Sequence, residues 1–180
     1  MPRRRRNVIA GHPYHVSNRG VERRRLFFKD AQYNAFLGLL ERGKERFAVD
    51  VWGLCLMPNH FHLVARATER NALSSFLHWV QGIYSRDLRA WTKTRGYGHV
   101  FQQRFWSGPI EDERHLLAIL RYVEANPVAA KLVTRAEDWP WTSLALRRSF
   151  RFQVLDPLPI RLPDDWSKRV NSESEPGDCD

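Results

Sequence analysis

Apolar residues recur along this chain with two different periods, and these periods predict its secondary structure. Alternation at every second residue is typical of half-buried strands, whereas apolar residues three and four apart are typical of amphipathic helices. The pattern predicts strands near residues 14–17, 49–56, 60–64 and 100–107, and helices near 30–44, 75–93 and 113–126. The first six elements follow the order of a ferredoxin-like split βαβ unit. We therefore expect an α+β fold with an antiparallel sheet and helices packed on it.

Short sequence signals set the expected boundaries of these elements. Asp30, Ser74 and Asp112 each precede a helical stripe and are candidate N-caps. Pro127 is expected to end the third helix, and residues 18–20 are expected to form a turn. We expect a basic arm at residues 1–13 and one folded domain at residues 14–150. Residues 151–180 are expected to form an extension with a disordered acidic tail.

Two histidines flank one phenylalanine in the run MPNHFHLV at residues 57–64. Because strand side chains alternate between faces, His60 and His62 should point to one side while Phe61 and Leu63 face the other. Two strand residues span about 6.6 Å, and imidazoles at that separation can converge on one metal ion. Taken alone, such a pair more often consists of ordinary histidines on a half-exposed strand. The remainder of a metal site must therefore come from elsewhere in the chain.

A second candidate element is the run LRYVEANP at residues 120–127. Residues four apart share one face of a helix, so Tyr122 and Asn126 can point at the same place. Asparagine offers a carbonyl oxygen as a metal ligand, and tyrosine offers a hydroxyl that can act as a nucleophile. Tyr122 as an amphipathic residue at the edge of the core and Asn126 as a residue of the helix end are the structural alternatives.

The ordered set of motifs resembles the REP-associated tyrosine transposases, from about residue 12 to residue 143. These belong to the single-tyrosine branch of the HUH (His-hydrophobic-His) endonucleases and are similar to small insertion-sequence transposases. The motifs are HVSNRG, MPNHFHLV, LRYVEANP, GHVFQQRFW and DWPWTS, at residues 15–20, 57–64, 120–127, 98–106 and 138–143. No single motif is decisive, and their order and spacing together carry the resemblance.

The resemblance implies both a fold and a mechanism. The fold would be the same split βαβ arrangement. His60 and His62 would hold a divalent metal ion with Asn126 as the candidate third ligand, and Tyr122 would attack a DNA phosphodiester. The products would be a 5′-phosphotyrosine link and a free 3′-hydroxyl, from which strands can be rejoined. Mg²⁺ and Mn²⁺ both suit the donors, the nitrogens favour Mn²⁺, and zinc remains a competitor.

The charge of the chain favours a polyanionic partner. The formal net charge is +9, which makes nucleic acid the first candidate. The resemblance implies single-stranded DNA with a foldback hairpin, and it implies that the amino-terminal region helps to read bases beside the hairpin. Asn18 and Arg19 are the candidates for that reading. The expected DNA contacts lie in a basic loop, on one helix face and among aromatic residues: Asn18, Arg19, Arg23, Arg24, Arg86, Arg89 and Arg104.

Two other functions stay open at this point: an inactive DNA- or RNA-binding protein, and a metal hydrolase in which the histidines activate water. The two cysteines, Cys55 and Cys179, indicate neither a disulfide framework nor a cysteine zinc site. We expect a cytoplasmic, nucleoid-associated bacterial protein, either monomer or homodimer. No membrane partner is expected, because no apolar stretch approaches the length of a membrane span.

Overall fold

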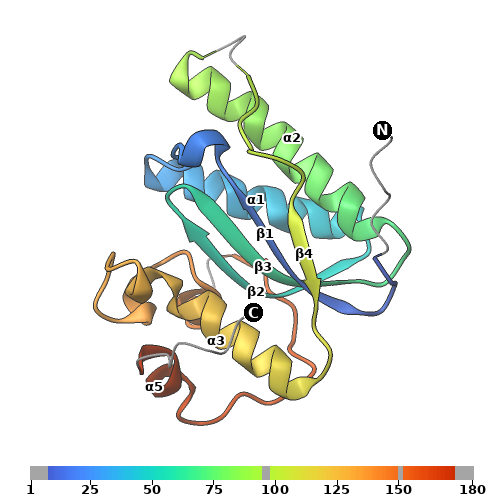
Figure 1. The fold of residues 1–180 in the computed structure, drawn as a ribbon, viewed down its shortest axis with the longest axis vertical. Helices are drawn as coiled ribbons and strands as arrows, with labels where there is room; N and C mark the ends of the chain where they lie inside the picture. The colour runs from blue at the N-terminus through green and yellow to red at the C-terminus, as the bar shows by residue number, and fades with distance from the viewer. Residues whose placement is uncertain (1–7, 95–97, 150–151, 173–180) are drawn as a thin grey trace.

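The computed structural model describes residues 8–94, 98–149 and 152–172. Its centre is a four-stranded antiparallel sheet with strand order β2-β3-β1-β4 and helices on both faces (Figure 1). The elements along these residues are β1 (Pro13–Arg19), η1 (Val21–Arg23), α1 (Asp30–Arg46), β2 (Val49–Met57), β3 (His60–Ala67), α2 (Ala72–Thr92), β4 (Trp106–Pro109), α3 (Glu113–Ala129), η2 (Ala136–Asp138), α4 (Ser143–Leu146) and α5 (Trp166–Asn171). The predicted α+β class and ferredoxin-like order are confirmed.

The sheet separates two hydrophobic cores. Helices α1 and α2 cover one face, and α3 and α5 lie on the other side (Figure 1). Phe61 and Leu63 of β3 are buried in the core under α1 and α2, whereas Val64 is buried in the core under α3. This alternation turns His60 and His62 toward α3, as the strand pattern predicts.

Two of the three predicted helix caps are wrong. Helix α1 begins at Asp30 itself, after an N-cap at Lys29. Instead of an Asp30 carboxylate, the Gln32 side-chain oxygen accepts hydrogen bonds from the backbone N–H groups of Phe28 and Lys29, at 2.6 and 3.2 Å. Helix α2 begins at Ala72 rather than after Ser74, with Asn71 at a φ of 64° as its N-cap.

The third predicted cap is confirmed, but the predicted end of the same helix is wrong. The Asp112 carboxylate accepts a hydrogen bond from the backbone N–H of His115 at 2.8 Å and caps α3. The helix continues past Pro127 to Ala129. Proline removes one helical donor, but the Ala130 N–H still donates to the Asn126 carbonyl at 2.9 Å and closes the last turn.

The first and fourth strands also differ from the prediction. Strand β1 runs through Asn18 and Arg19, which were expected to turn, and β4 covers only Trp106–Pro109. Upstream of β4, the Asn18 side-chain amide donates to the Gln103 carbonyl at 3.1 Å. Pairing with the end of β1 resumes further upstream, where the Gln102 N–H donates to the Arg19 carbonyl at 2.9 Å, so the predicted strand is interrupted between Gln102 and Trp106.

The C-terminal extension packs on the body of the protein over its described part. Val154 is buried in the core under α1 and α2, and Trp166 and Val170 of α5 are buried against the α3 side. The first seven residues of the predicted arm and residues 173–180 of the predicted tail lie outside the described residues. Over the ranges that the structure describes, none of the helices combines the length and the hydrophobicity needed to cross a bilayer.

Candidate active site

The face of the sheet that meets α3 carries three histidines beside one tyrosine. His60 and His62 come from β3 and His15 from the neighbouring strand β1. The ring centroids of His62 and His60 are 5.1 Å apart, and those of His62 and His15 are 5.2 Å apart. Tyr122 of α3 lies against this cluster, with its ring centroid 5.6 Å from that of His62 and 5.8 Å from that of His15. One chain therefore brings both predicted elements together.

Asn126 lies one turn along α3 from Tyr122, on the same face of the helix, as the four-residue spacing predicts. Its side-chain amide donates to the Tyr122 backbone carbonyl at 2.8 Å, and its side chain is near enough to His60 to raise the pKa of that histidine. Asn59, at the start of the same strand, places its Oδ1 atom 2.7 Å from His60 Nδ1. A neutral His60 that donates from Nδ1 to Asn59 keeps its lone pair on Nε2.

Burial keeps the three imidazoles neutral at physiological pH. Burial, followed by the charge of His115, lowers the pKa of His15 to about 4. Burial, followed by the charge of Arg19, lowers the pKa of His60 to about 4, although the nearby Asn126 side chain opposes this shift. Burial, followed by the charges of His15 and His60, lowers the pKa of His62 well below its ordinary value. Neutral imidazoles retain a lone pair and can bind metal.

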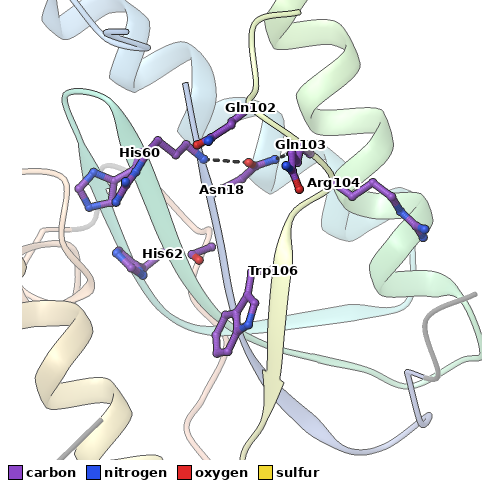
Figure 2. Close-up of a pocket in the computed structure, with 9 residues that line it drawn as sticks. Asn18, His60, His62, Gln102, Gln103, Arg104 and Trp106 are labelled. Atoms are coloured by element: carbon purple, nitrogen blue, oxygen red, sulfur yellow. Dashed lines mark hydrogen bonds between the residues drawn. The ribbon is translucent and has the colours of Figure 1, made fainter. Parts of the chain in front are cut away.

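A cavity of about 300 Å³ opens beside the histidines, between the sheet and the segment that leads into β4 (Figure 2). Tyr122 contacts the histidines from α3 and is not one of the residues that line this cavity. The Trp106 ring lies over Gly108, and a Cβ atom at residue 108 would come within 2.5 Å of the indole. The absence of a side chain at Gly108 leaves room for this ring beside the cavity. The lining residues are Ser17, Asn18, Arg19, His60, His62, Gln102, Gln103, Arg104 and Trp106.

The predicted DNA-contacting residues fall into two groups. Asn18, Arg19 and Arg104 line the cavity beside the histidines. The Asn18 side chain is only 8% exposed, because its amide donates to Gln81 Oε1 of α2 at 2.7 Å as well as to the Gln103 carbonyl.

The other predicted contacts lie away from that cavity. Arg24 forms an ion pair with Glu22 in the exposed turn η1, which also holds Arg23. On α2, Arg86 pairs with Asp87, and Arg89 donates to the Gly98 carbonyl. The DNA-binding roles of all seven residues stay predictions.

No role was expected for His15, and Trp106 was expected only as one of the aromatic residues around Arg104 that suit stacking on unpaired bases. His15 Nε2 lies 2.9 Å from His62 Nδ1, and the ring centroids of His15 and Trp106 are 5.3 Å apart. The alternation of β1 places His15 on one face, but only the pairing of β1 with β3 places it beside His62. Within the described ranges, no group of three or more His, Cys, Asp or Glu is arranged to hold a metal ion. A candidate metal site here therefore depends on the Asn126 amide.

The fold and this site define an α+β protein in which a helix-borne tyrosine faces a histidine pair on the central sheet. The model of the family "Transposase IS200 like" matches residues 8–126. The chain therefore belongs to the IS200-like transposase family.

Two further likenesses agree with this assignment. The chain is 25% identical over 141 residues to a Haemophilus influenzae protein whose name assigns it to the REP-associated tyrosine transposases, covering 74% of this chain and 75% of that protein. A solved structure of a REP-associated tyrosine transposase bound to a REP hairpin matches with a TM-score of 0.66 at 18% identity, covering 91% of this chain and 96% of the other. The predicted resemblance is thereby confirmed at the level of family and fold.

Proposed function

We propose that this transposase is a metal-dependent enzyme that nicks and rejoins hairpin-bearing single-stranded DNA through a 5′-phosphotyrosine intermediate. The observation that carries the proposal is the contact between Tyr122 and His62 within one chain, at a ring-centroid distance of 5.6 Å. A nucleophile on one element and metal ligands on another are useful only if they meet at one phosphate. Because Tyr122 and His62 meet within one chain, a single chain would supply both the nucleophile and the metal ligands.

The donors on this face fit a divalent cation. His60 and His62 would supply imidazole nitrogens, and Asn126, whose side chain lies near His60, would supply its side-chain oxygen. Two neutral nitrogens and one oxygen suit Mn²⁺ or Mg²⁺, with Mn²⁺ favoured by the nitrogens. When bound, the ion would polarise the target phosphate and stabilise the charge that develops in the transition state.

Tyr122 would perform the covalent step. Its side chain is 39% exposed, so the phenolic proton can leave to solvent as the oxygen attacks phosphorus. The phosphorus–O3′ bond breaks, and the leaving 3′ oxygen takes up a proton to become a 3′-hydroxyl. The 5′ phosphate stays on Tyr122. Because the new bond is again a phosphodiester, a 3′-hydroxyl can later attack it and release the tyrosine.

The proposed substrate follows from the charge of the chain and from its relatives. A net charge of +9 favours a polyanion, and the matching solved structure is described as bound to a REP hairpin. Arg19 and Arg104 lie at the cavity beside the histidines, where they can neutralise phosphates next to the bond that breaks.

The test is detection of a covalent protein–DNA adduct by denaturing gel and intact mass, using hairpin oligonucleotides with Mn²⁺ or Mg²⁺. We expect an adduct with the wild-type protein and none with Tyr122→Phe or His60→Ala. Tyr14→Phe and His12→Ala are matched controls, because Tyr14 is buried on the opposite face of the sheet and His12 packs against its ring. DNA binding without an adduct across a broad hairpin panel would favour an inactive binding protein. Cleavage that survives Tyr122→Phe would favour a metal-activated water.

A further inference from the structure

The turn that joins β2 to β3 is attached to the loop that follows β1. This loop, residues 20–27, is called the arginine loop here, and it lies beside the β2–β3 hairpin (Figure 1). The Leu26 N–H donates to the Pro58 carbonyl at 2.8 Å. The Gly20 N–H donates to the Asn59 carbonyl, also at 2.8 Å. The first histidine of the site follows this turn directly, so the loop and the candidate metal ligand have one support in common.

The Asn59 side chain contacts both the arginine loop and that histidine. Its Nδ2 atom donates to the Arg23 carbonyl at 3.2 Å, and its Oδ1 atom lies 2.7 Å from His60 Nδ1. A carbonyl oxygen can only accept, so the Arg23 carbonyl fixes which end of the amide is the donor. The Oδ1 atom must then accept a hydrogen bond, and His60 Nδ1 must carry the proton. This arrangement leaves the lone pair of His60 on Nε2, the nitrogen that remains free for a metal ion.

The arginine loop has a conformation that needs outside support. Glu22 and Arg23 both have left-handed backbone angles, with φ of 52° and 58°. Side chains other than glycine hold this conformation only where surrounding contacts impose it, and such residues cluster at functional sites. The hydrogen bond from Asn59 to the Arg23 carbonyl is one of these contacts. The loop carries three consecutive exposed arginines, residues 23–25, against one glutamate, which suits phosphate groups.

We propose that Asn59 is a positioning residue that couples the arginine loop to the metal site, so that a DNA phosphate on the loop strengthens metal binding by His60. The inference rests on the proposed function, which supplies both the DNA and the cation. A phosphate held by the loop fixes the Arg23 carbonyl, the carbonyl fixes the Asn59 amide, and the amide fixes the tautomer and orientation of His60. Coupling of this kind is reciprocal, so the cation strengthens DNA binding by the same factor. The protein would thus hold its cation firmly only when DNA is present.

Two substitutions separate the two hydrogen bonds of Asn59. Asn59→Asp keeps an acceptor for His60, but a carboxylate cannot donate to the Arg23 carbonyl. Asn59→Ala removes both interactions. Asn34→Ala is the matched control, because Asn34 is a half-buried asparagine of α1, on the other face of the sheet. All proteins carry Tyr122→Phe, so that no covalent adduct forms during the measurements, and thermal unfolding checks that each variant is folded.

The first measurements use the protein without DNA. Nitrogen-15 NMR of the metal-free protein at neutral pH should find the His60 proton on Nδ1 with Asn59 present, and a different tautomer balance in Asn59→Ala. Calorimetric titration with Mn²⁺ alone should show a loss of about 10- to 100-fold in affinity for Asn59→Ala, the usual cost of removing a residue that orients a metal ligand. Asn59→Asp and Asn34→Ala should bind Mn²⁺ at least as tightly as the protein with Asn59, since both keep an acceptor for His60.

The second measurement repeats the Mn²⁺ titration with a saturating hairpin oligonucleotide. The ratio of the affinities with and without DNA gives the coupling factor, which we expect to be at least about fivefold larger with Asn59 than with Asn59→Asp. Direct contact between a DNA phosphate and the cation acts in both proteins. The difference between the two ratios therefore measures the path through the Asn59 amide.

Each outcome decides the assignment. A His60 proton on Nε2 with Asn59 present, undiminished Mn²⁺ affinity in folded Asn59→Ala, or equal coupling factors with Asn59 and Asn59→Asp would each overturn it. If Asn59→Ala does not fold, the tautomer and the Asn59→Asp ratio still decide. Failure of the proposed function is read separately in the protein with Tyr122: coupling through Asn59 without any covalent adduct keeps the positioning role and loses the enzyme.

Discussion

His15 Nε2 lies 2.9 Å from His62 Nδ1 in the buried centre of the site. Each of these histidines is 7% exposed, and they come from adjacent strands of the sheet. One proton is shared across this contact. If His62 binds a cation through Nε2, its Nδ1 carries that proton and donates it to His15. His15 would then fix the tautomer and ring orientation of His62 without touching the metal.

This relationship predicts that His15→Ala weakens metal binding. Loss of a residue that orients a ligand typically costs 10- to 100-fold in metal affinity, so we expect a loss of about that size. Titration of the DNA-free protein with Mn²⁺ alone, followed by calorimetry, measures the affinity directly. His12→Ala is the control, because His12 contacts Tyr14 and not the site. Unchanged Mn²⁺ affinity in His15→Ala would contradict this positioning role.

The contact between Tyr122 and His62 within one chain predicts cleavage in cis. Tyr122→Phe retains the histidines and His60→Ala retains the tyrosine, so a mixture of the two proteins can be active only if a tyrosine reaches the histidines of another chain. We expect no adduct in the mixture on a denaturing gel. An adduct on the His60→Ala chain would instead require exchange of α3 between subunits.

Strand and helix periodicity predicted much of this arrangement. Alternation in β3 placed His60 and His62 on one face, and the four-residue spacing placed Tyr122 and Asn126 on one face of α3. Both placements depend only on the spacing of residues within one strand or one helix, which can be read from the sequence. The antiparallel split βαβ order followed from the sequence of the elements themselves.

The parts that could not be predicted depend on contacts between distant residues. The neighbour of His62 is decided by the register of β1 against β3, which no local pattern encodes. The interruption of the predicted fourth strand before Trp106 coincides with the hydrogen bond from the Asn18 side-chain amide to the Gln103 carbonyl, a contact between distant residues. Helix α5 has only six residues, too few for a clear hydrophobic period, and it is held by burial of Trp166 and Val170.

The lowered histidine pKa values predict that the metal-free protein loses stability in mild acid. The ordinary pKa is 6.5, and it falls to about 4 in folded His15 and His60. Above pH 6.5 these rings are neutral in both states. Between pH 6.5 and about 4 the unfolded chain binds protons that the folded chain does not, so the free energy of unfolding falls as the pH falls.

Urea unfolding with a chelator at a series of pH values measures this dependence. Each histidine contributes at most about 1.4 kcal/mol per pH unit within the window. A His15→Phe variant should show a shallower slope, because one such histidine is removed. Stability that stays flat from pH 7 to 4.5 in the wild type would contradict the prediction.

Glu124 holds α3, the helix that carries Tyr122, in place. It lies two residues from both Tyr122 and Asn126, on the opposite side of α3, and is 0% exposed. Its carboxylate accepts hydrogen bonds from Ser143 and Arg147, and from Trp166 Nε1 at 2.7 Å. Arg147 in turn donates to the Trp52 carbonyl of β2 at 2.9 Å. This network joins α3 to the sheet, α4 and α5.

Glu124→Ala should therefore destabilise the protein, because it leaves the polar groups of Arg147, Ser143 and Trp166 without their buried acceptor. Removal of one partner of a buried pair costs about 3–5 kcal/mol, and the partial exposure of Arg147 places the expected loss near 3 kcal/mol. Urea unfolding measures this loss. Asp164→Ala is the control, since its ion pair with Arg161 is exposed on both sides and should contribute little. Equal stability of the two variants would mean that the network does not anchor the helix, and that the packing of Leu120 and Val123 alone holds Tyr122 against the histidines.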